Sequence, residues 1–275
     1  MISDRSVSFF QKLKLLFRFW TILPKLPAKF AIIKFINPID STRYVEFIYF
    51  LDFLKRNNMQ KGKALDISSP FLMAYFLSDD FEVLKTDIND EEKKYIKESP
   101  HLKFEKADGT ALTYPDNTFD ISFSISVVEH IYQKYIDCIN EMIRVTKPGG
   151  YIYVSFPISK VMSEEWIEND IYSDQHKSSE KTFFQYRFDE KNLNEIKNSL
   201  KNVKVVQEDL FWERKDGEYD KLIDKLRTKI NNKYLSLVWF GVVNYYYGFT
   251  LISKADKSFK NASSFGNYQG IFRKV

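Results

Sequence analysis

The segment "KALDISSPF", residues 63–71, decides how the rest of the chain is interpreted. A short strand is expected from Lys63 to Ile67, and Asp66 lies near its end. Two serines follow, and then a helix from Pro70 to Ser78, with proline in the first turn, where the missing N–H costs little. A strand that turns this tightly into a helix predicts the first unit of an α/β fold.

The same alternation continues over the next 80 residues. Further strands are expected at residues 82–86, 102–106, 119–123 and 151–156, with helices at 90–98 and 127–145. Strands separated by helices imply right-handed crossovers and a parallel sheet covered on both faces. The sequence therefore predicts an α/β fold that is Rossmann-like and doubly wound around a mostly parallel sheet.

The residues at the carboxyl ends of the expected strands are the candidates for ligand binding. In open parallel sheets, ligands bind beyond these ends, where the strand order reverses. The positions are acidic or small, and no lysine or arginine directly follows a strand. They are Asp66, Ser68 and Ser69 after the first strand, Asp87 after the second, Asp108 and Gly109 after the third, and Ser124 at the fourth.

This residue set favours one kind of ligand over another. A site for a polyphosphate needs a P-loop lysine or a glycine-rich helix start, and Pro70 removes one of the N–H groups that would bind phosphate. Carboxylates instead accept hydrogen bonds from ribose hydroxyls and amino groups. S-adenosylmethionine carries these groups and no phosphate, so the residues favour it over a pyrophosphate cofactor.

Four segments together resemble a known family. They are "KALDISSPF", "VLKTDIND", "FEKADGTALTYPDNTFDISFSISVVEHI" and "INEMIRVTKPGGYIYVSFP", and the third is the most specific. The run 62–156 resembles the class I S-adenosylmethionine-dependent methyltransferases, in particular the type 11 methyltransferase domain group. The resemblance implies a seven-stranded sheet with a reversed last strand, and this sheet would include residues 203–211 and 249–254.

The resemblance also implies roles for individual residues. Asp66 would lie near the methionine part of the cofactor, and Asp87, beside Ile88, would hold the ribose. Asp108 would face the adenine amino group, with Gly109 and Thr110 beside it, and Ser124 would line the methyl-bearing side. The family has glycines where this chain has Ser68 and Ser69, whose hydroxyls could replace close backbone contact with hydrogen bonds.

Each of these roles has a simpler structural alternative. Asp66 and Asp108 could only stabilise turns, and Asp87 could only precede a capped helix. His130 is the candidate catalytic base, but it could equally cap and pack a helix. The leading function is methyl transfer to a small-molecule or lipid-like acceptor. The alternative is a non-catalytic, methyltransferase-like binding or scaffold protein, which the Ser68–Ser69–Pro70 turn would favour.

Composition limits the partners and the location of the protein. The chain has 275 residues, 44% apolar and 28% charged, with 41 basic and 37 acidic residues. This balance predicts a folded core and gives no indication of nucleic-acid binding. With one cysteine and three histidines, no metal site is predicted. These features favour a cytoplasmic protein, and the oligomeric state stays open.

The flanking regions are expected to be less regular than the core. We expect a basic, aromatic N-terminal cap at 1–40, a cofactor-binding core at 41–156, a loop or lid and a helix at 157–202, two strands with a helical insertion at 203–254, and an irregular tail at 255–275. Residues 8–36 could contact a membrane peripherally, or form a lid or dimer arm. The uncharged run 234–252 predicts a buried helix and a strand rather than a membrane span.

Overall fold

The computed structural model describes residues 7–168, 175–178 and 180–275. The chain divides into two compact units, and we describe each by itself. The helical unit comprises Met1–Met59 and Leu210–Gly266, and the sheet unit comprises Gln60–Asp209 and Asn267–Val275. The helical unit therefore combines the predicted N-terminal cap with most of the predicted helical insertion.

The sheet has a doubly wound strand order, as predicted. Strand β1 pairs in parallel with β2 on one side and β4 on the other, and β2 continues to β3 while β4 continues to β5. The full order is β10-β9-β11-β5-β4-β1-β2-β3, which is eight strands rather than the expected seven. The core strands are β1 (Lys63–Ile67), β2 (Glu82–Asp87), β3 (Leu102–Lys106), β4 (Phe119–Ile125) and β5 (Thr146–Ile158).

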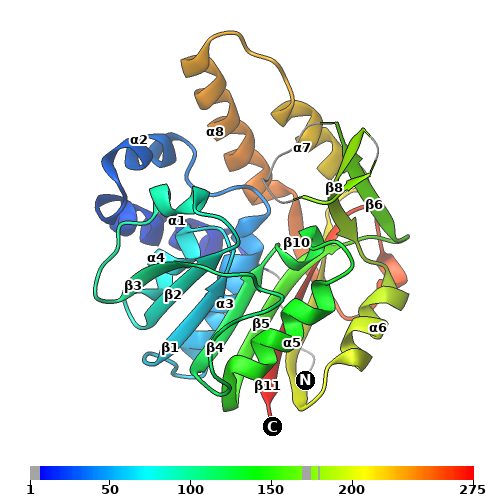
Figure 1. Ribbon diagram of the computed structural model, residues 1–275. Helices are drawn as coiled ribbons and strands as arrows, with labels where there is room; N and C mark the ends of the chain where they lie inside the picture. Colours follow the sequence, from blue (N-terminus) through cyan, green and yellow to red (C-terminus); the bar gives the residue numbers. More distant parts are fainter. Residues whose placement is uncertain (1–6, 169–174, 179) are drawn as a thin grey trace. The chain divides into compact units, whose positions relative to one another are not determined.

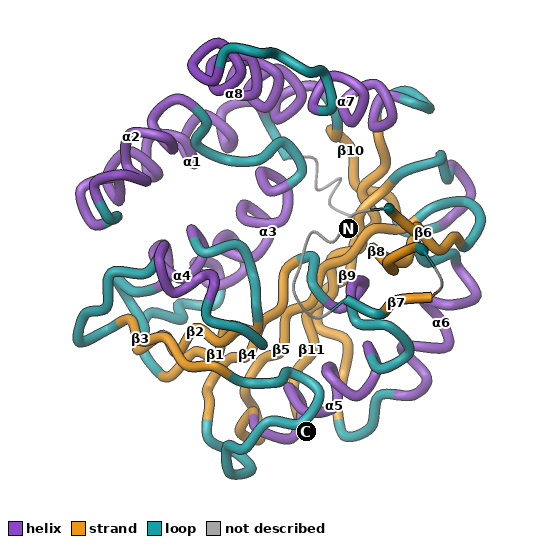
Figure 2. The backbone as a smooth tube through the Cα atoms, turned by 45° about the horizontal axis from the view of Figure 1, so that its top comes forward, coloured by secondary structure: helices purple, strands orange, loops and turns teal. Residues whose placement is uncertain are grey.

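Helices lie on both faces of the sheet unit. Figures 1 and 2 show α4 (Leu72–Leu77) on one face and α5 (Tyr135–Val145) on the other. Two predicted helices are shorter than expected. The charged helix over 90–98 is a 3-10 turn, η2 (Glu91–Tyr95), and the long helix over 127–145 is divided into a 3-10 turn, η3 (Val128–His130), and α5.

The loop or lid predicted over 157–187 is wrong where the structure describes it. A second, three-stranded sheet with the order β6-β8-β7 forms there, with β6 at Ser163–Ile167, β7 at Lys177–Ser178 and β8 at Lys181–Arg187. Residues 169–174 and 179 of the predicted lid lie outside the described residues. The serine- and lysine-rich sequence concealed the aromatic residues of β8, where Phe183 and Tyr186 are buried. Helix α6 (Glu190–Ser199) follows and is capped by the Asp189 side chain.

The irregular tail predicted over 255–275 is also wrong. Nine of its residues form β11 (Gly266–Lys274), which lies between β9 (Val203–Glu213) and β5 in the sheet. The strand looks polar, but its polar side chains satisfy one another inside the sheet unit. Gln269 donates to Asn267 and accepts from the Tyr153 hydroxyl, and both amides are buried. Paired amides can be buried at little cost, which a hydropathy pattern does not reveal.

Among its described residues, the helical unit contains five helices, the short strand β10 and the end of β9. Ser8 caps α1 in a reciprocal capping box with Gln11, and Asn232 caps α8 by accepting two backbone N–H groups. The elements are α1 (Phe9–Ile22), α2 (Ala28–Ile36), α3 (Arg43–Arg56), α7 (Glu218–Leu226), α8 (Lys233–Thr250) and β10 (Ile252–Asp256), with 3-10 turns η1 (Leu23–Lys25) and η4 (Phe259–Asn261).

Helix α8 packs through its small and polar residues. A methyl group added to Gly241 would come within 2.4 Å of the Ile36 carbonyl oxygen, and one added to Gly248 within 2.6 Å of the Tyr44 ring. Between these glycines, Asn244 donates to the Asn37 side chain and accepts the Ser41 N–H. Gly241, Asn244 and Gly248 therefore lie on the packed face of the helix.

A buried lysine closes the carboxyl end of α8. The Lys12 ammonium donates to the carbonyl oxygens of Phe249 and Ile252 at 3.3 and 3.0 Å. Burial, together with Arg214, lowers the pKa of Lys12 to about 8. The predicted order of a helix and then a strand over 234–252 is confirmed, although α8 buries only one face. In the described part of the chain, we find no helix with both the length and the apolar character to cross a bilayer.

The β11–β5 contact can be tested by removing one hydroxyl. Tyr153→Phe is expected to lower the free energy of unfolding by about 1–3 kcal/mol, because Gln269 loses a buried donor. Urea denaturation measures this change. Tyr151→Phe, on the same strand and only half-buried, is the matched control and should change stability by less than about 0.5 kcal/mol. Equal effects of both substitutions would refute the buried amide network.

Candidate functional site

The candidate site is the edge of the sheet where four parallel strands end. β1, β2, β3 and β4 are neighbours in the sheet, so their carboxyl ends meet at one edge. The chain proceeds from β1 toward β3 on one side and from β4 toward β5 on the other. The strand order therefore reverses between β1 and β4, which is the position where open α/β sheets bind ligands.

Asp66 lies at the end of β1 and is completely buried. Its Oδ1 accepts the Ser69 N–H at 3.0 Å, whereas Oδ2 has no hydrogen-bond partner among the described residues. Burial raises the pKa of this carboxyl to about 7, and the neighbouring Lys85 opposes the rise. A buried carboxylate oxygen without a hydrogen bond costs free energy unless a ligand supplies a donor.

Ser68 adopts the backbone conformation that glycine favours. Its φ angle is +51°, in the left-handed region, and its N–H donates to the Thr86 carbonyl oxygen at 2.8 Å. A residue with a Cβ atom pays a steric cost there that glycine does not. The turn therefore keeps a glycine-type conformation although the chain has serine at this position.

Ser69 and Ser124 join the strands that flank the reversal point. The Ser69 hydroxyl oxygen accepts the Ile125 N–H at 3.0 Å, and the Ser124 hydroxyl donates to the Ile67 carbonyl oxygen at 3.3 Å. Both side chains are buried. They connect the turn after β1 to β4, so the structure gives both serines a bracing role. Direct contact between either residue and a cofactor stays a prediction.

Lys85 is a site residue that the sequence analysis missed. Its buried ammonium donates to the Ser69 carbonyl oxygen at 2.5 Å and lies 2.9 Å from Glu92 Oε2 and 3.8 Å from Asp66 Oδ2. Burial alone would lower the pKa of Lys85, but the carboxylates of Asp66 and Glu92 outweigh it and raise the pKa. A lysine directly after Val83 and Leu84, inside the strand and close to its carboxyl end, was the available signal.

Asp87 and Asp108 end the next two strands along the edge. Asp87 is almost buried and accepts the Asn89 N–H at 3.2 Å, and Asp108 accepts both the N–H and the hydroxyl of Thr110 at 2.8 Å. Each of these bonds uses Oδ1, as in Asp66. The turn-forming alternative noted for Asp108 is therefore observed, and Asp87 likewise holds a local turn instead of capping η2. Contact between either acid and a cofactor stays a prediction.

The residues beside these acids differ in exposure and in packing. Ile88 follows Asp87 and is 42% exposed at this edge. Gly109 packs closely, because an added methyl group would lie 2.8 Å from Ile67 Cγ2 and 3.2 Å from Cys138 Sγ. Glycine at this position therefore serves close packing of the third strand's end against the first strand and α5.

His130 lies in the turn η3 after β4 rather than at the start of a long helix. Its Nδ1 is 2.5 Å from the Phe184 carbonyl oxygen of β8, and its ring packs against the Phe184 ring with centroids 5.0 Å apart. Nε2 lies 3.8 Å from Glu129 Oε1. An imidazole whose Nδ1–H donates to a carbonyl oxygen presents an unprotonated Nε2 in its neutral form.

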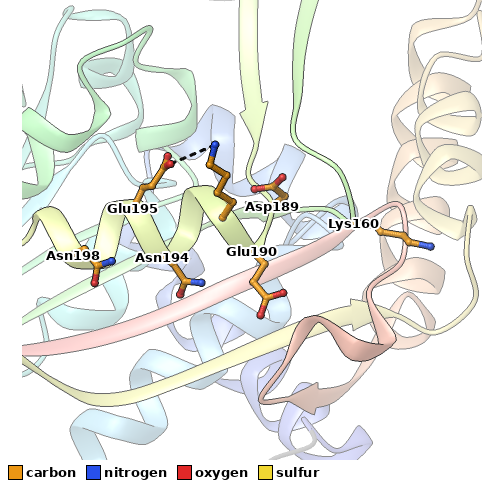
Figure 3. A pocket seen from close by; sticks show the side chains of 7 residues that line it. Lys160, Asp189, Glu190, Asn194, Glu195 and Asn198 are labelled. Carbon is orange, nitrogen blue, oxygen red and sulfur yellow. Dashed lines mark ion pairs between the residues drawn. The ribbon is translucent and has the colours of Figure 1, made fainter.

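A hollow elsewhere in the sheet unit involves none of these residues. Figure 3 shows it along α6, where Lys191 pairs with Glu195 at 3.8 Å. The hollow has a volume of about 590 Å³ and mostly exposed, polar walls. Its lining residues are Lys160, Asp189, Glu190, Lys191, Asn194, Glu195 and Asn198. Because its lining residues are all polar or charged and mostly exposed, it is not a candidate cofactor site.

Comparison with known families agrees with the geometry of this edge. Residues 65–154 match a family described as "Methyltransferase domain", and this range contains Asp66, Asp87, Asp108 and Ser124. The resemblance to S-adenosylmethionine-dependent methyltransferases is therefore confirmed. An uncharacterized methyltransferase of Mycobacterium leprae is 46% identical over 55 residues, and one of Mycobacterium tuberculosis is 40% identical over 55. These matches cover 20% of this chain and about a fifth of the length of each curated relative.

Solved structures share the fold of the chain. The chain is similar to a coclaurine N-methyltransferase bound to N-methylheliamine and SAH, with a TM-score of 0.53, 13% identity, and coverage of 97% of this chain and 88% of that one. It is also similar to a protein assigned as a sarcosine dimethylglycine methyltransferase from Galdieria sulphuraria, with a TM-score of 0.51, 13% identity and 84% of each chain covered. At this identity the likeness defines a Rossmann-like methyltransferase fold.

Substitutions at Ser68 test the left-handed turn. Ser68→Val is expected to lower the free energy of unfolding by about 1–2 kcal/mol, because a β-branched side chain crowds the backbone at positive φ. Ser68→Gly removes the Cβ atom and should leave stability unchanged or raised. Chemical denaturation of the two variants measures the difference. If valine is tolerated as well as glycine, Ser68 does not have the positive φ angle described here.

The raised pKa of Asp66 predicts how stability depends on pH. Between about pH 4 and pH 7 the folded protein holds a proton that the unfolded chain has lost, so the contribution of Asp66 to stability falls as pH rises. Relative to Asp66→Asn, the wild type should lose about 2–4 kcal/mol of unfolding free energy across this window. Urea unfolding of both proteins at several pH values measures it, and parallel pH profiles would contradict the assignment.

Proposed function

We propose that the protein is an S-adenosylmethionine-dependent methyltransferase that acts on a small-molecule or lipid-like acceptor. One observation carries the proposal. At the reversal point of the sheet, the turn after β1 keeps a glycine-type conformation at Ser68 beside a buried Asp66 oxygen to which no described residue donates a hydrogen bond. Both features cost stability in the free protein, and both suit a ligand that brings a donor close to the backbone.

The residues at this edge fit the groups of S-adenosylmethionine. Asp66 Oδ2 would accept from the amino group of the methionine part, and Asp87 would accept from the ribose hydroxyls. Asp108 would accept from the adenine amino group, with Gly109 and Thr110 beside it. Ile88 would contribute apolar contact next to the ribose. Lys85 is surrounded by acceptors of the protein itself, which agrees with a cofactor that lacks phosphate.

Bound S-adenosylmethionine would supply a methyl group activated by a sulfonium. The chain would then need to align the acceptor with this methyl group and exclude water from the site. His130 is the candidate base, since Nδ1 is held at the Phe184 carbonyl oxygen and Nε2 is the nitrogen that could take a proton from an acceptor hydroxyl or amine. Coclaurine N-methyltransferase, which shares the fold, is bound to a small molecule, and this supports a small acceptor.

The alternative function is a non-catalytic, methyltransferase-like binding or scaffold protein. A specific observation favours it: the Ser69 carbonyl oxygen is bonded to Lys85 and the Ser69 hydroxyl to the Ile125 N–H, so these groups of the turn are used within the protein. Isothermal titration calorimetry with S-adenosylmethionine separates the two functions, because a scaffold of this kind would give no binding heat. The acceptor and the cytoplasmic location stay predictions under either function.

The role of Asp87 provides the sharpest test of the cofactor site. Asp87→Ala should weaken S-adenosylmethionine binding by about 1.5–3 kcal/mol, because charged hydrogen bonds to the ribose are lost. Asp80→Ala is the matched control, since this exposed acid precedes β2 and therefore lies at the opposite end of the strand. Calorimetry measures both affinities. Unchanged affinity in Asp87→Ala, with binding intact in the wild type, would reject the assignment of Asp87.

A further inference from the structure

Helix α1 of the helical unit turns an aromatic face toward solvent. One face of α1 is buried, at Leu15, Leu16, Phe19 and Ile22. The opposite face would be polar in an ordinary surface helix. Here Phe10 is 78% exposed, and Phe17 and Trp20 are exposed beside Lys14, with the Phe17 and Trp20 rings in edge-to-face contact at 5.4 Å.

Helix α2 continues this apolar exposure. None of its residues is buried, and Ile32 and Phe35, which lie on one face, are 68% and 64% exposed. An apolar hollow of about 380 Å³ lies along η1 and α2. It is lined by Leu23, Pro24, Ala31, Ile32, Phe35 and Ile36. Contact between these apolar walls and water costs free energy unless a partner covers the hollow.

A third apolar stripe lies on α8, in the same unit. α8 contacts α2 at Gly241 and Ile36, and the Phe249 ring lies 5.1 Å from the Phe9 ring of α1. The face of α8 opposite its packed glycines is exposed and apolar. Its exposed large residues are Tyr234, Leu235, Val238, Val242 and Tyr246. Repeated spacings of three and four residues place the last four of these on one side of the helix.

The charged residues within the two stretches of sequence that contain these stripes are of one sign. The sequence has no aspartate or glutamate from Arg5 to Ile39 or from Lys225 to Ala255. Lys12 is buried against carbonyl oxygens and does not contribute to the surface. The basic residues of α1, η1 and α2 that do contribute are Lys14, Arg18, Lys25, Lys29 and Lys34.

We propose that α1, η1, α2 and α8 form a docking surface for an anionic lipid bilayer. Phenylalanine, tryptophan and aliphatic side chains would enter the boundary between head groups and acyl chains, while the lysines reach lipid phosphates. Each lysine near such a surface adds to binding, and the absence of acids in these stretches removes the opposing repulsion. In this arrangement the helices would lie along the membrane surface.

The charge of this surface favours an anionic bilayer over a second copy of the chain as its partner. Two copies that paired through this face would bring their basic residues together, and such like-charge contact is unfavourable. An anionic bilayer complements both the apolar stripes and the charge. The inference is independent of the proposed methyl transfer, because it uses no residue of the sheet edge.

Vesicle co-sedimentation of the full chain, without S-adenosylmethionine, tests the proposal. The protein should pellet with vesicles of phosphatidylcholine and phosphatidylglycerol, remain in solution with phosphatidylcholine alone, and be released by high salt. The double variant Phe17→Glu with Phe35→Glu should bind at least about tenfold more weakly. Val161→Glu is the matched control, since Val161 is 71% exposed in the sheet unit, and it should bind like the wild type.

A second pair of variants tests the charge and avoids the apolar residues. Lys14→Glu with Lys29→Glu should weaken binding about tenfold or more, whereas Lys103→Glu with Lys201→Glu, the same charge change on exposed lysines of the sheet unit, should have little effect. Circular dichroism confirms that each variant is folded. If Phe17→Glu with Phe35→Glu does not fold, the charge variants alone decide the outcome.

Two results would overturn the proposal. The first is that the wild type does not pellet with anionic vesicles, or that the variants at the helical unit and their controls bind equally well. The second is a dimer in sedimentation velocity, without lipid, that Phe17→Glu with Phe35→Glu dissociates, which would assign the surface to a second copy. Cofactor calorimetry is a separate measurement, so a failure of the proposed methyltransferase function would leave the vesicle result unaffected.

Discussion

The buried ammonium group of Lys85 is the interaction on which the candidate site depends. It lies beneath the turn after β1, bonds to the Ser69 carbonyl oxygen, and has the carboxylates of Glu92 and Asp66 around it. A buried charge is tolerated only when acceptors surround it, so the turn, β2 and η2 must hold these positions together. Loss of one partner would leave an uncompensated charge next to the turn. Lys85 therefore couples the conformation of the turn to the neighbouring strand.

The turn itself holds two features that stability alone would not favour. Ser68 has a left-handed backbone with a Cβ atom present, and Asp66 buries a carboxylate oxygen without a hydrogen bond among the described residues. Local costs of this kind concentrate at functional sites, where a ligand compensates for them. The bracing bonds from Ser69 to Ile125 and from Ser124 to Ile67 connect the turn to β4. They give the reversal point of the sheet a rigid frame.

In the helical unit, several large apolar side chains face solvent while small and polar residues are packed. Its α8 uses Gly241, Asn244 and Gly248 for close packing, and a stripe of large apolar residues on another side of the helix faces solvent. Small residues allow backbones to approach closely, and the packing they provide does not require the larger side chains. Phe17 on α1 and Phe35 on α2 are exposed in the same way. An apolar outer surface bordered by lysines follows directly from this arrangement.

The sequence by itself determined the alternation of strands and helices and the acids at strand ends, because these depend on local period and on neighbours along the chain. Asp66, Asp87 and Asp108 could be placed at one edge for that reason. Only the tertiary structure revealed β11, whose Asn267 and Gln269 look exposed until they pair with each other and with Tyr153. It likewise revealed the three-stranded sheet over 163–187 and the role of Lys85. These features depend on partners distant in sequence, which no local pattern records.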